Sequence, residues 1–176
     1  MRYYTTVESP VGTLTVISDG EAVTGLDFPL RRGRPRPAPE GTRAPELPVL
    51  RQTERWLAAY FAGEDPGPVP PVRTEGTAFQ ERVWAKLRAI PCGEVTTYGR
   101  IADAIAAETG RRQSAQAVGG AVGRNPVAIL IPCHRVVGSG GSLTGFGGGL
   151  DAKVRLLETE GVDMARLFRP KSGTAL

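Results

Sequence analysis

The sequence has few of the residues that build disulfide frameworks and metal sites. Its 176 residues include two cysteines, one histidine and 6% aromatic residues. Two cysteines without a CxxC spacing cannot form a disulfide network, and with one histidine they offer at most three soft metal ligands. No nucleotide-binding motif is present either. We therefore expect no structural zinc, and the chain offers no motif for a cofactor.

Long apolar runs are also missing. No stretch approaches the roughly 20 apolar residues of a transmembrane helix, and the opening MRYYTTVESPVG lacks the apolar segment of a signal peptide. We therefore expect a cytoplasmic protein with no membrane partner. The formal net charge of +4 permits a polyanionic partner without requiring one.

The first part of the chain predicts a small α/β domain over residues 1–75. Short β-branched or aromatic runs separated by turn residues predict an antiparallel meander, with strands over 2–7, 12–18 and 21–28. Apolar spacing predicts a helix over 47–62 that ends at Gly63. Between them, the Pro- and Arg-rich segment 31–48 predicts an exposed loop without a packed element, with DNA contact as an alternative role.

The second part, over residues 76–165, predicts a helical domain. It follows the turn-rich GEDPGPVPPVRTEG and opens with Thr77 and Gln80, which are spaced as a capping box for a helix that stops at Pro91. A second helix begins near Tyr98, and Ser114 is a good N-cap for a third. The last two helices have the outline of a helix-turn-helix.

The third helix, AQAVGGAVG, is unusually poor in side chains. Gly119 and Gly120 should each cost about 1 kcal/mol relative to alanine inside a helix. Close packing against a neighbouring helix would compensate for this cost. A smooth face that approaches a nucleic-acid groove is the other explanation, and the helix alone does not separate the two.

The stretch NPVAILIPCHRVVG carries the reactive groups. VAILI predicts a buried strand or extended segment that ends at Pro132, which leaves the Cys133 thiol at an edge. The pair could be structural, or a nucleophile with its base. Because neighbours on an extended segment point to opposite sides, the second reading needs a turn at His134 or a bridging water, and a carboxylate from Glu158 or Glu160. A Cys-His protease or acyltransferase would leave the glycine-rich helix unexplained.

IPCHRVVG, preceded by AVGGAVGRNP and followed by LTGFGGG and LLETEG, resembles the signature of the O6-alkylguanine-DNA alkyltransferases, the methylated-DNA-[protein]-cysteine methyltransferases. The resemblance is tight over about 77–162. It implies a ribonuclease H-like N-terminal α/β domain, a winged-helix-like C-terminal domain and a tail over 166–176.

The activity that this resemblance implies is direct DNA repair by a monomer. The family flips O6-alkylguanine, and also O4-alkylthymine, out of duplex DNA from the minor groove and transfers the alkyl group irreversibly to its own cysteine. A non-catalytic sensor of alkylated DNA is the alternative. The presence of Cys133 together with His134, Glu160 and Asn125 argues against it.

The resemblance also assigns roles to residues of the site. Cys133 matches the alkyl acceptor, His134 the base that acts through a water, and Glu160 the carboxylate that orients it. The remaining matches are Asn125, which ties the turn to the helix-turn-helix; Tyr98, which crowds the phosphate and protonates guanine; Lys153, near the leaving oxygen; Phe146, Gly147 and Val136, which contact the flipped base; and Arg135, an ion-pair partner.

A further group matches DNA-contacting positions of the family. These are Ser114, Gln116, Ala117, Gly119, Arg112 and Arg124. The family commonly has an arginine that fills the gap left by the flipped base, where this chain has Gln116. Arg111, Arg112 or Arg124 are candidates to replace it. Cys92 matches no family role and is expected to be inert.

Overall fold

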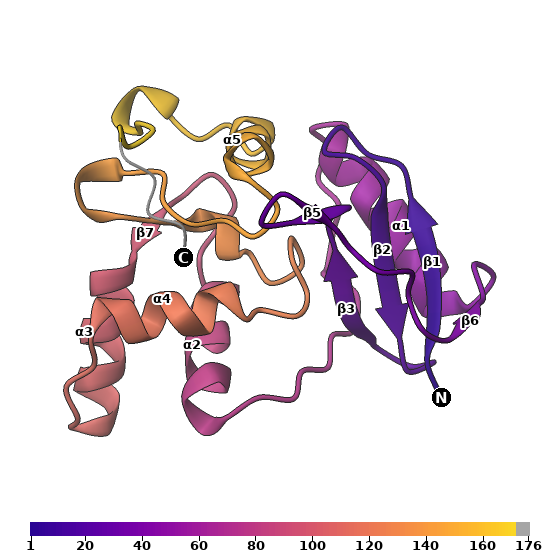
Figure 1. Cartoon of the computed structure of the whole chain (residues 1–176), viewed down its shortest axis with the longest axis horizontal. Helices are drawn as coiled ribbons and strands as arrows, with labels where there is room; N and C mark the ends of the chain where they lie inside the picture. The colour runs from indigo at the N-terminus through magenta and orange to yellow at the C-terminus, as the bar shows by residue number, and fades with distance from the viewer. Residues whose placement is uncertain (172–176) are drawn as a thin grey trace. The chain divides into compact units, whose positions relative to one another are not determined.

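The computed structural model describes residues 1–171, which form two compact units (Figure 1). The first unit contains Met1–Thr74 and Pro126–Leu130, and the second contains Glu75–Asn125 and the chain from Ile131 onward. A sheet with one helix forms the first unit, and helices dominate the second. The expected α/β class with a helical C-terminal part is thus observed.

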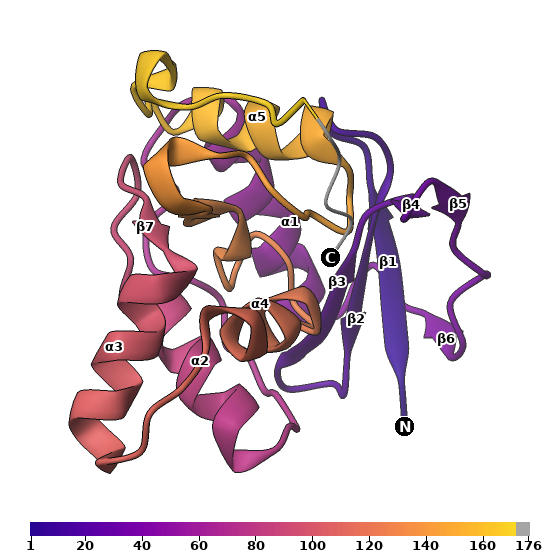
Figure 2. The same ribbon diagram turned by 60° about the vertical axis from the view of Figure 1, so that its left-hand side comes forward.

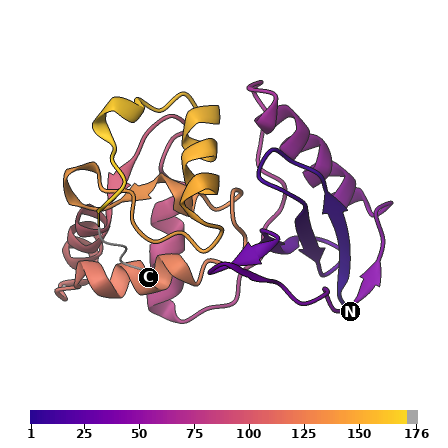
Figure 3. The same ribbon diagram turned by 45° about the horizontal axis from the view of Figure 1, so that its top comes forward.

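A four-stranded sheet in the order β3-β2-β1-β6 is the centre of the first unit. The meander strands are β1 (Tyr3–Val7), β2 (Leu14–Ser18) and β3 (Val23–Asp27), paired antiparallel as expected. Helix α1 (Pro48–Phe61) packs against β1 and β2 and covers one face of the sheet (Figures 1 and 3). The core between them is made by alternating strand positions and one helix face, including Leu14, Val16, Leu50 and Leu57.

The Pro- and Arg-rich segment is more ordered than expected. It contains a hairpin of β4 (Leu30–Arg31) and β5 (Arg34–Pro35), and β6 (Thr42–Arg43) pairs parallel with β1 as the edge strand of the sheet. The prediction of a segment without a packed element was therefore wrong. Gly41, at φ +124°, brings the chain against Arg2. A Cβ at this position would lie 2.4 Å from the Arg2 carbonyl oxygen, so only glycine fits there.

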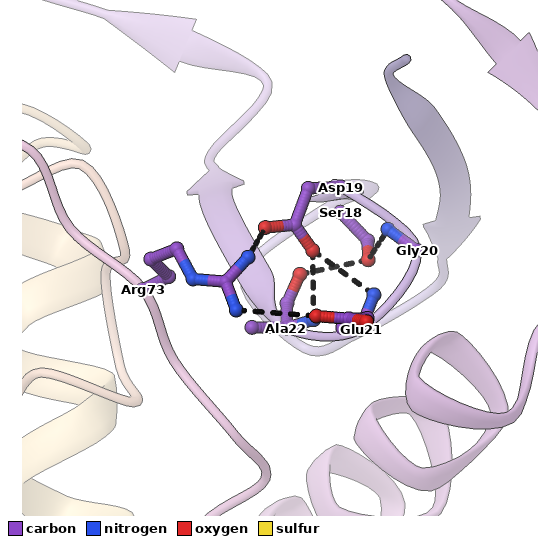
Figure 4. A network of polar contacts seen from close by, with 6 residues as sticks. All are labelled: Ser18, Asp19, Gly20, Glu21, Ala22 and Arg73. Carbon is purple, nitrogen blue, oxygen red and sulfur yellow. Dashed lines mark hydrogen bonds and ion pairs between the residues drawn. The ribbon is translucent and has the colours of Figure 1, made fainter.

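The free edge of β3 is covered by the chain that leaves the first unit. The Val23 amide donates to Pro71 at 2.8 Å, and the Arg73 amide donates to Val23 at 2.9 Å. The Arg73 guanidinium also pairs with the carboxylates of Asp19 and Glu21 in the β2–β3 turn (Figure 4). These contacts hold residues 71–73 in a short parallel bridge along the edge of β3.

The segment Pro126–Leu130 pairs with the same strand. The Leu26 amide donates to Pro126 at 3.0 Å, and Ala128 donates back to Leu26 at 3.3 Å. Val127 forms an isolated bridge with Leu26, and the backbone then turns through Ile129 at φ +69°. VAILI is thus a bridge and a turn, not a strand, and it interrupts the domain expected over 76–165 because its backbone partner is Leu26 of the first unit.

Four helices organise the second unit: α2 (Ala78–Arg88), α3 (Tyr98–Thr109), α4 (Ala115–Gly123) and α5 (Leu150–Thr159). The capping box at Thr77 and the Ser114 N-cap are present as the sequence predicts, and α3 ends at Gly110 in the left-handed conformation. Helix α2 ends at Arg88, before Pro91. Helix α4 packs across both α2 and α3 (Figure 2), and the Trp84 indole donates to Ala121 at 2.9 Å. No helix within residues 1–171 has the length and apolarity to cross a membrane.

Short elements join the helices of this unit. Two-residue strands β7 (Thr96–Thr97) and β8 (Val136–Val137) pair in parallel. Three turns of 3-10 helix cover Cys133–Arg135, Ser139–Gly141 and Met164–Arg166.

The segment after α5 packs back onto the glycine-rich loop that precedes it. Leu143 donates to the Phe168 carbonyl at 2.8 Å, and Phe168 donates to Gly141 at 3.1 Å. The expected tail over 166–176 therefore begins with paired residues, while 172–176 lie outside the described residues. This pairing fixes one end of the loop that leads to Thr144.

Gly141 and Gly140 form a matched pair for testing that attachment. A Cβ on Gly141, at φ +94°, would lie 2.1 Å from the Arg166 carbonyl oxygen, whereas Gly140, at φ +70°, has open space around it. Gly140→Ala should lower the free energy of unfolding by roughly 1–2 kcal/mol through backbone strain alone. Gly141→Ala should cost clearly more, and equal losses in urea unfolding would contradict the close approach.

Candidate active site

A turn presents the cysteine and histidine together. The 3-10 turn over Cys133–Arg135 follows Pro132, and β8 then pairs with β7, which leads directly into Tyr98 at the start of α3. The sequence left open a turn at the pair or a bridging water, and the chain does turn there. The thiol is less accessible than an edge position suggests, because Cys133 is only 8% exposed and His134 is fully buried.

One carboxylate holds both residues that follow the thiol. Glu160, which caps the C-terminus of α5, lies with Oε1 2.7 Å from His134 Nε2. Arg135 donates to both of its oxygens, from Nε at 2.9 Å and Nη2 at 2.8 Å, and donates from Nη1 to the Ile90 carbonyl at 2.6 Å. Arg135 is thus the expected ion-pair partner, and Glu160 is the carboxylate at the histidine, whereas Glu158 is exposed.

These contacts fix the state of the imidazole. Burial alone would raise the pKa of Glu160, but its hydrogen bonds to His134 and Arg135 lower that pKa to about 2. Burial lowers the pKa of His134, against the opposing effect of Glu160. An ionised carboxylate only accepts, so Nε2 carries the proton, and Nδ1 is left as a base. Nδ1 is buried without a hydrogen-bond partner among residues 1–171.

The thiol is surrounded by groups that favour its ionised form. Burial raises the pKa of Cys133, while a hydrogen bond from the Asn125 side chain and the charge of Lys153 act to lower it. The Asn125 amide also donates to the Ile131 carbonyl at 2.8 Å, which ties the end of α4 to the approach to Cys133. Desolvation therefore opposes ionisation of the thiol, while one side-chain hydrogen bond and one nearby positive charge favour it.

Lys153 and Tyr98 lie near the thiol and come from two different helices. The fully buried Lys153 donates from Nζ to the carbonyls of Val136 at 2.6 Å and Thr144 at 2.9 Å. Burial lowers its pKa to about 8, and the nearby Cys133 opposes that shift. Burial raises the pKa of Tyr98, whose side chain is hydrogen-bonded to Thr144 and lies near Cys133, so the phenol remains a proton donor.

Thr144 is the site residue that analysis of the sequence missed. Its carbonyl accepts a hydrogen bond from Lys153, and its side chain is hydrogen-bonded to Tyr98. Thr144 therefore joins two residues that are 55 positions apart in the sequence. The sequence offered one indication of its role, because Thr144 lies in LTGFGGG, two residues before the expected loop residue Phe146. Phe146 is half-buried and Gly147 exposed, whereas Val136 is buried and offers its carbonyl to Lys153.

The exposed face of α4 is smooth and nearly uncharged. Ser114, Gln116, Ala117, Arg112 and Arg124 are all exposed at this helix or its ends. Gly119 is buried, so it serves close packing, and the expectation that it faces DNA is not supported. Gly120 takes the open position, since a Cβ there would meet no atom within 4 Å. Close packing against a neighbouring helix thus explains Gly119, and a smooth face open to a nucleic-acid groove fits Gly120.

No three His, Cys, Asp or Glu side chains in the described part of the chain are placed to hold a metal ion. The groups gathered at the site are a thiol, an imidazole and a guanidinium that share the Glu160 carboxylate, a lysine bound to two backbone carbonyls, and a phenol. The features of the site are those of a protein in which a cysteine itself accepts a group.

Comparison with known proteins identifies the class. Residues 78–162 match the DNA-binding domain of the 6-O-methylguanine DNA methyltransferases, and residues 2–67 match their ribonuclease-like domain. A methylated-DNA–protein-cysteine methyltransferase of Haemophilus influenzae is 45% identical over 90% of this chain and 86% of its own. One from Mycobacterium tuberculosis is 43% identical over 91% of this chain and 93% of its own.

Solved structures agree with this result. The crystal structure of Mycobacterium tuberculosis OGT in complex with DNA superposes with a TM-score of 0.80, at 41% identity and 94% coverage of both chains. The chain belongs to the 6-O-methylguanine DNA methyltransferase family. It is accordingly a methyltransferase of DNA repair whose acceptor is a protein cysteine.

The Glu160 contacts predict a loss of stability in acid. Because the pKa of Glu160 falls from 4.5 to about 2 on folding, its contribution is complete above pH 4.5 and is lost as the pH drops towards 2. We expect this contribution to be on the order of 2–3 kcal/mol, allowing for solvent screening. Urea unfolding between pH 6 and pH 3 should show a shallower pH dependence in Glu160→Gln than in the unsubstituted protein.

Glu158→Gln provides the control, because Glu158 is exposed two residues earlier on the same helix. It should leave the pH dependence of unfolding unchanged. An acid dependence that Glu158→Gln reduces as much as Glu160→Gln does would contradict the role of the buried carboxylate.

Proposed function

We propose that Cys133 accepts the alkyl group of O6-alkylguanine in duplex DNA, once per molecule. The observation that carries this proposal is the buried thiol beside a histidine whose Nε2 is held by Glu160 and whose Nδ1 is unpartnered within residues 1–171. A structural cysteine would need neither an oriented base nor a buried cation. The same chemistry would serve O4-alkylthymine, which presents an alkyl carbon on an equivalent oxygen.

The transfer is a displacement at carbon. The thiol proton passes to His134 Nδ1 through a water, and the resulting thiolate attacks the alkyl carbon. The new Sγ–C bond forms as the bond between carbon and O6 breaks, and guanine leaves with the bonding electrons. The product is a neutral thioether, which has no base-assisted route back to the thiolate. Each molecule therefore reacts once.

Two further groups support this step. Tyr98 stays protonated because burial raises its pKa, so its phenol can supply the proton that the departing guanine takes up. Lys153 sits beside Cys133 with both of its carbonyl partners fixed, and its charge favours the thiolate and the negative charge that develops on O6. Phe146 and Gly147 would cover the flipped base from the adjacent loop.

We infer that α4 enters the minor groove as a monomer binds. Its exposed face combines Gln116, Ala117 and Gly120, which allow the backbone to approach closely, while Arg112 and Arg124 at its ends suit phosphates. Flipping a base costs a few kcal/mol and is easiest at a damaged pair. Gln116 would fill the gap through hydrogen bonds to the orphaned cytosine, without adding charge.

Intact mass measurement tests the acceptor. After incubation with excess duplex containing one O6-methylguanine, the protein should gain one methyl group, and peptide mapping should locate it at Cys133. Cys133→Ser should gain none while still binding DNA, because only the nucleophile is removed. Cys92→Ser is the matched control, since Cys92 is exposed outside the site, and it should react fully. The proposal would be contradicted if Cys133→Ser were methylated, or if the unsubstituted protein folded and bound DNA but gained no methyl group.

Gly120 tests the mode of DNA binding. Gly120→Leu adds a large side chain in open space, so it should raise the free energy of unfolding by up to about 1 kcal/mol through helix propensity. The same side chain should block close approach to the groove and weaken binding to duplex DNA at least tenfold. The control is Ala85→Leu on the exposed side of α2, which should leave affinity unchanged. Tight DNA binding by Gly120→Leu would exclude this face.

A further inference from the structure

The β4–β5 hairpin is a built element with an unusual charge. Arg32 at φ +51° and Gly33 at φ +74° form the two-residue turn, as in the primed turns that join antiparallel strands. Its base is attached to the sheet, because the Arg36 amide donates to Pro29 at 3.1 Å and the Arg36 guanidinium lies 2.9 Å from Asp27. The hairpin projects beside the meander strands of its own unit (Figure 2).

Positive charge is concentrated at this hairpin. The first unit contains nine basic and nine acidic residues, yet residues 30–36 contain four arginines and no acid. Arg36 forms an ion pair with the Asp27 carboxylate, and the charge of Arg31 also acts to lower the pKa of Asp27. Arg31, Arg32 and Arg34 are exposed and form no ion pair with any residue of 1–171. A unit with no net charge thus presents one strongly cationic projection.

The pairing of the strands brings like charges together. Arg31 and Arg34 are direct partners across the hairpin. Like charges directly opposite one another destabilise a strand pair, so the fold alone gives no reason for this arrangement. An anion between or beside the two guanidiniums would remove the repulsion. Arginine matches phosphate especially well, because its planar fork donates two parallel hydrogen bonds.

We propose that this hairpin is a second DNA-contacting surface, which binds backbone phosphates through Arg31, Arg32 and Arg34. The proposal rests on the proposed function, since it assigns a further contact to the same DNA. It fits the composition of α4, whose residues 115–123 carry no charge at all. A smooth helix gives close approach but little electrostatic attraction, and phosphate contacts supply most of the affinity for non-specific DNA.

The experiment measures salt dependence with unmodified duplex DNA. Fluorescence anisotropy at several salt concentrations gives the slope of log K against log salt, which changes by about 0.9 for each phosphate contact on B-DNA. Arg31→Gln/Arg34→Gln should reduce the magnitude of this slope by about 1–2 and weaken binding several-fold at low salt. Both positions are exposed, so the melting temperature should not fall.

A matched variant separates a local contact from a general charge effect. Arg51→Gln/Arg55→Gln removes the same charge from exposed positions of α1 in the same unit and should leave the slope unchanged. Equal changes in both variants, or no change in the hairpin variant, would overturn the proposal. Methyl transfer to Cys133 from saturating methylated duplex should stay complete in Arg51→Gln/Arg55→Gln. Its absence in the unsubstituted protein would mark failure of the proposed function instead.

Discussion

The buried Glu160 carboxylate is the interaction on which the site depends. It ends α5, receives the imidazole of His134 and chelates the Arg135 guanidinium, which in turn reaches the carbonyl that follows α2. Without an acceptor at that position, His134 would have no preferred tautomer and Arg135 would be a poorly compensated cation. The two oxygens of Glu160 therefore orient His134. Through Arg135 they also join the end of α5, the Cys133–Arg135 turn and the chain after α2.

Desolvation acts on every titratable group of the site, and the partners decide the outcome. It disfavours the ionised thiol, the protonated lysine and the protonated histidine alike. The pKa of Glu160, by contrast, shifts in the direction that favours the charged form, because two donors more than offset its burial. A thiol that is costly to ionise until substrate arrives would be protected from side reactions such as oxidation.

Much of this architecture could be predicted from local patterns. The caps at Thr77 and Ser114 and the apolar spacing of each helix involve neighbouring residues, so the sequence alone places those elements correctly. The pairing of β6 with β1 and of Ala128 with Leu26 depends on contacts between distant residues, and no local pattern encodes it. In the site, the Cys-His-Arg stretch indicates the chemistry, whereas the part played by Thr144 follows only from the three-dimensional return of its loop to Lys153 and Tyr98.

The pairing of β3 with two remote segments has a consequence for how this protein can evolve. The chain leaves the first unit after Thr74, re-enters it at Pro126 and leaves it again after Leu130, between Asn125 and Cys133. A fragment that began at residue 75 would retain the cysteine but would lack Leu26, the backbone partner of Pro126 and Ala128. The two modules are interleaved, so recombination at a single linker could not exchange the sheet for another domain without disturbing the turn that leads to the thiol.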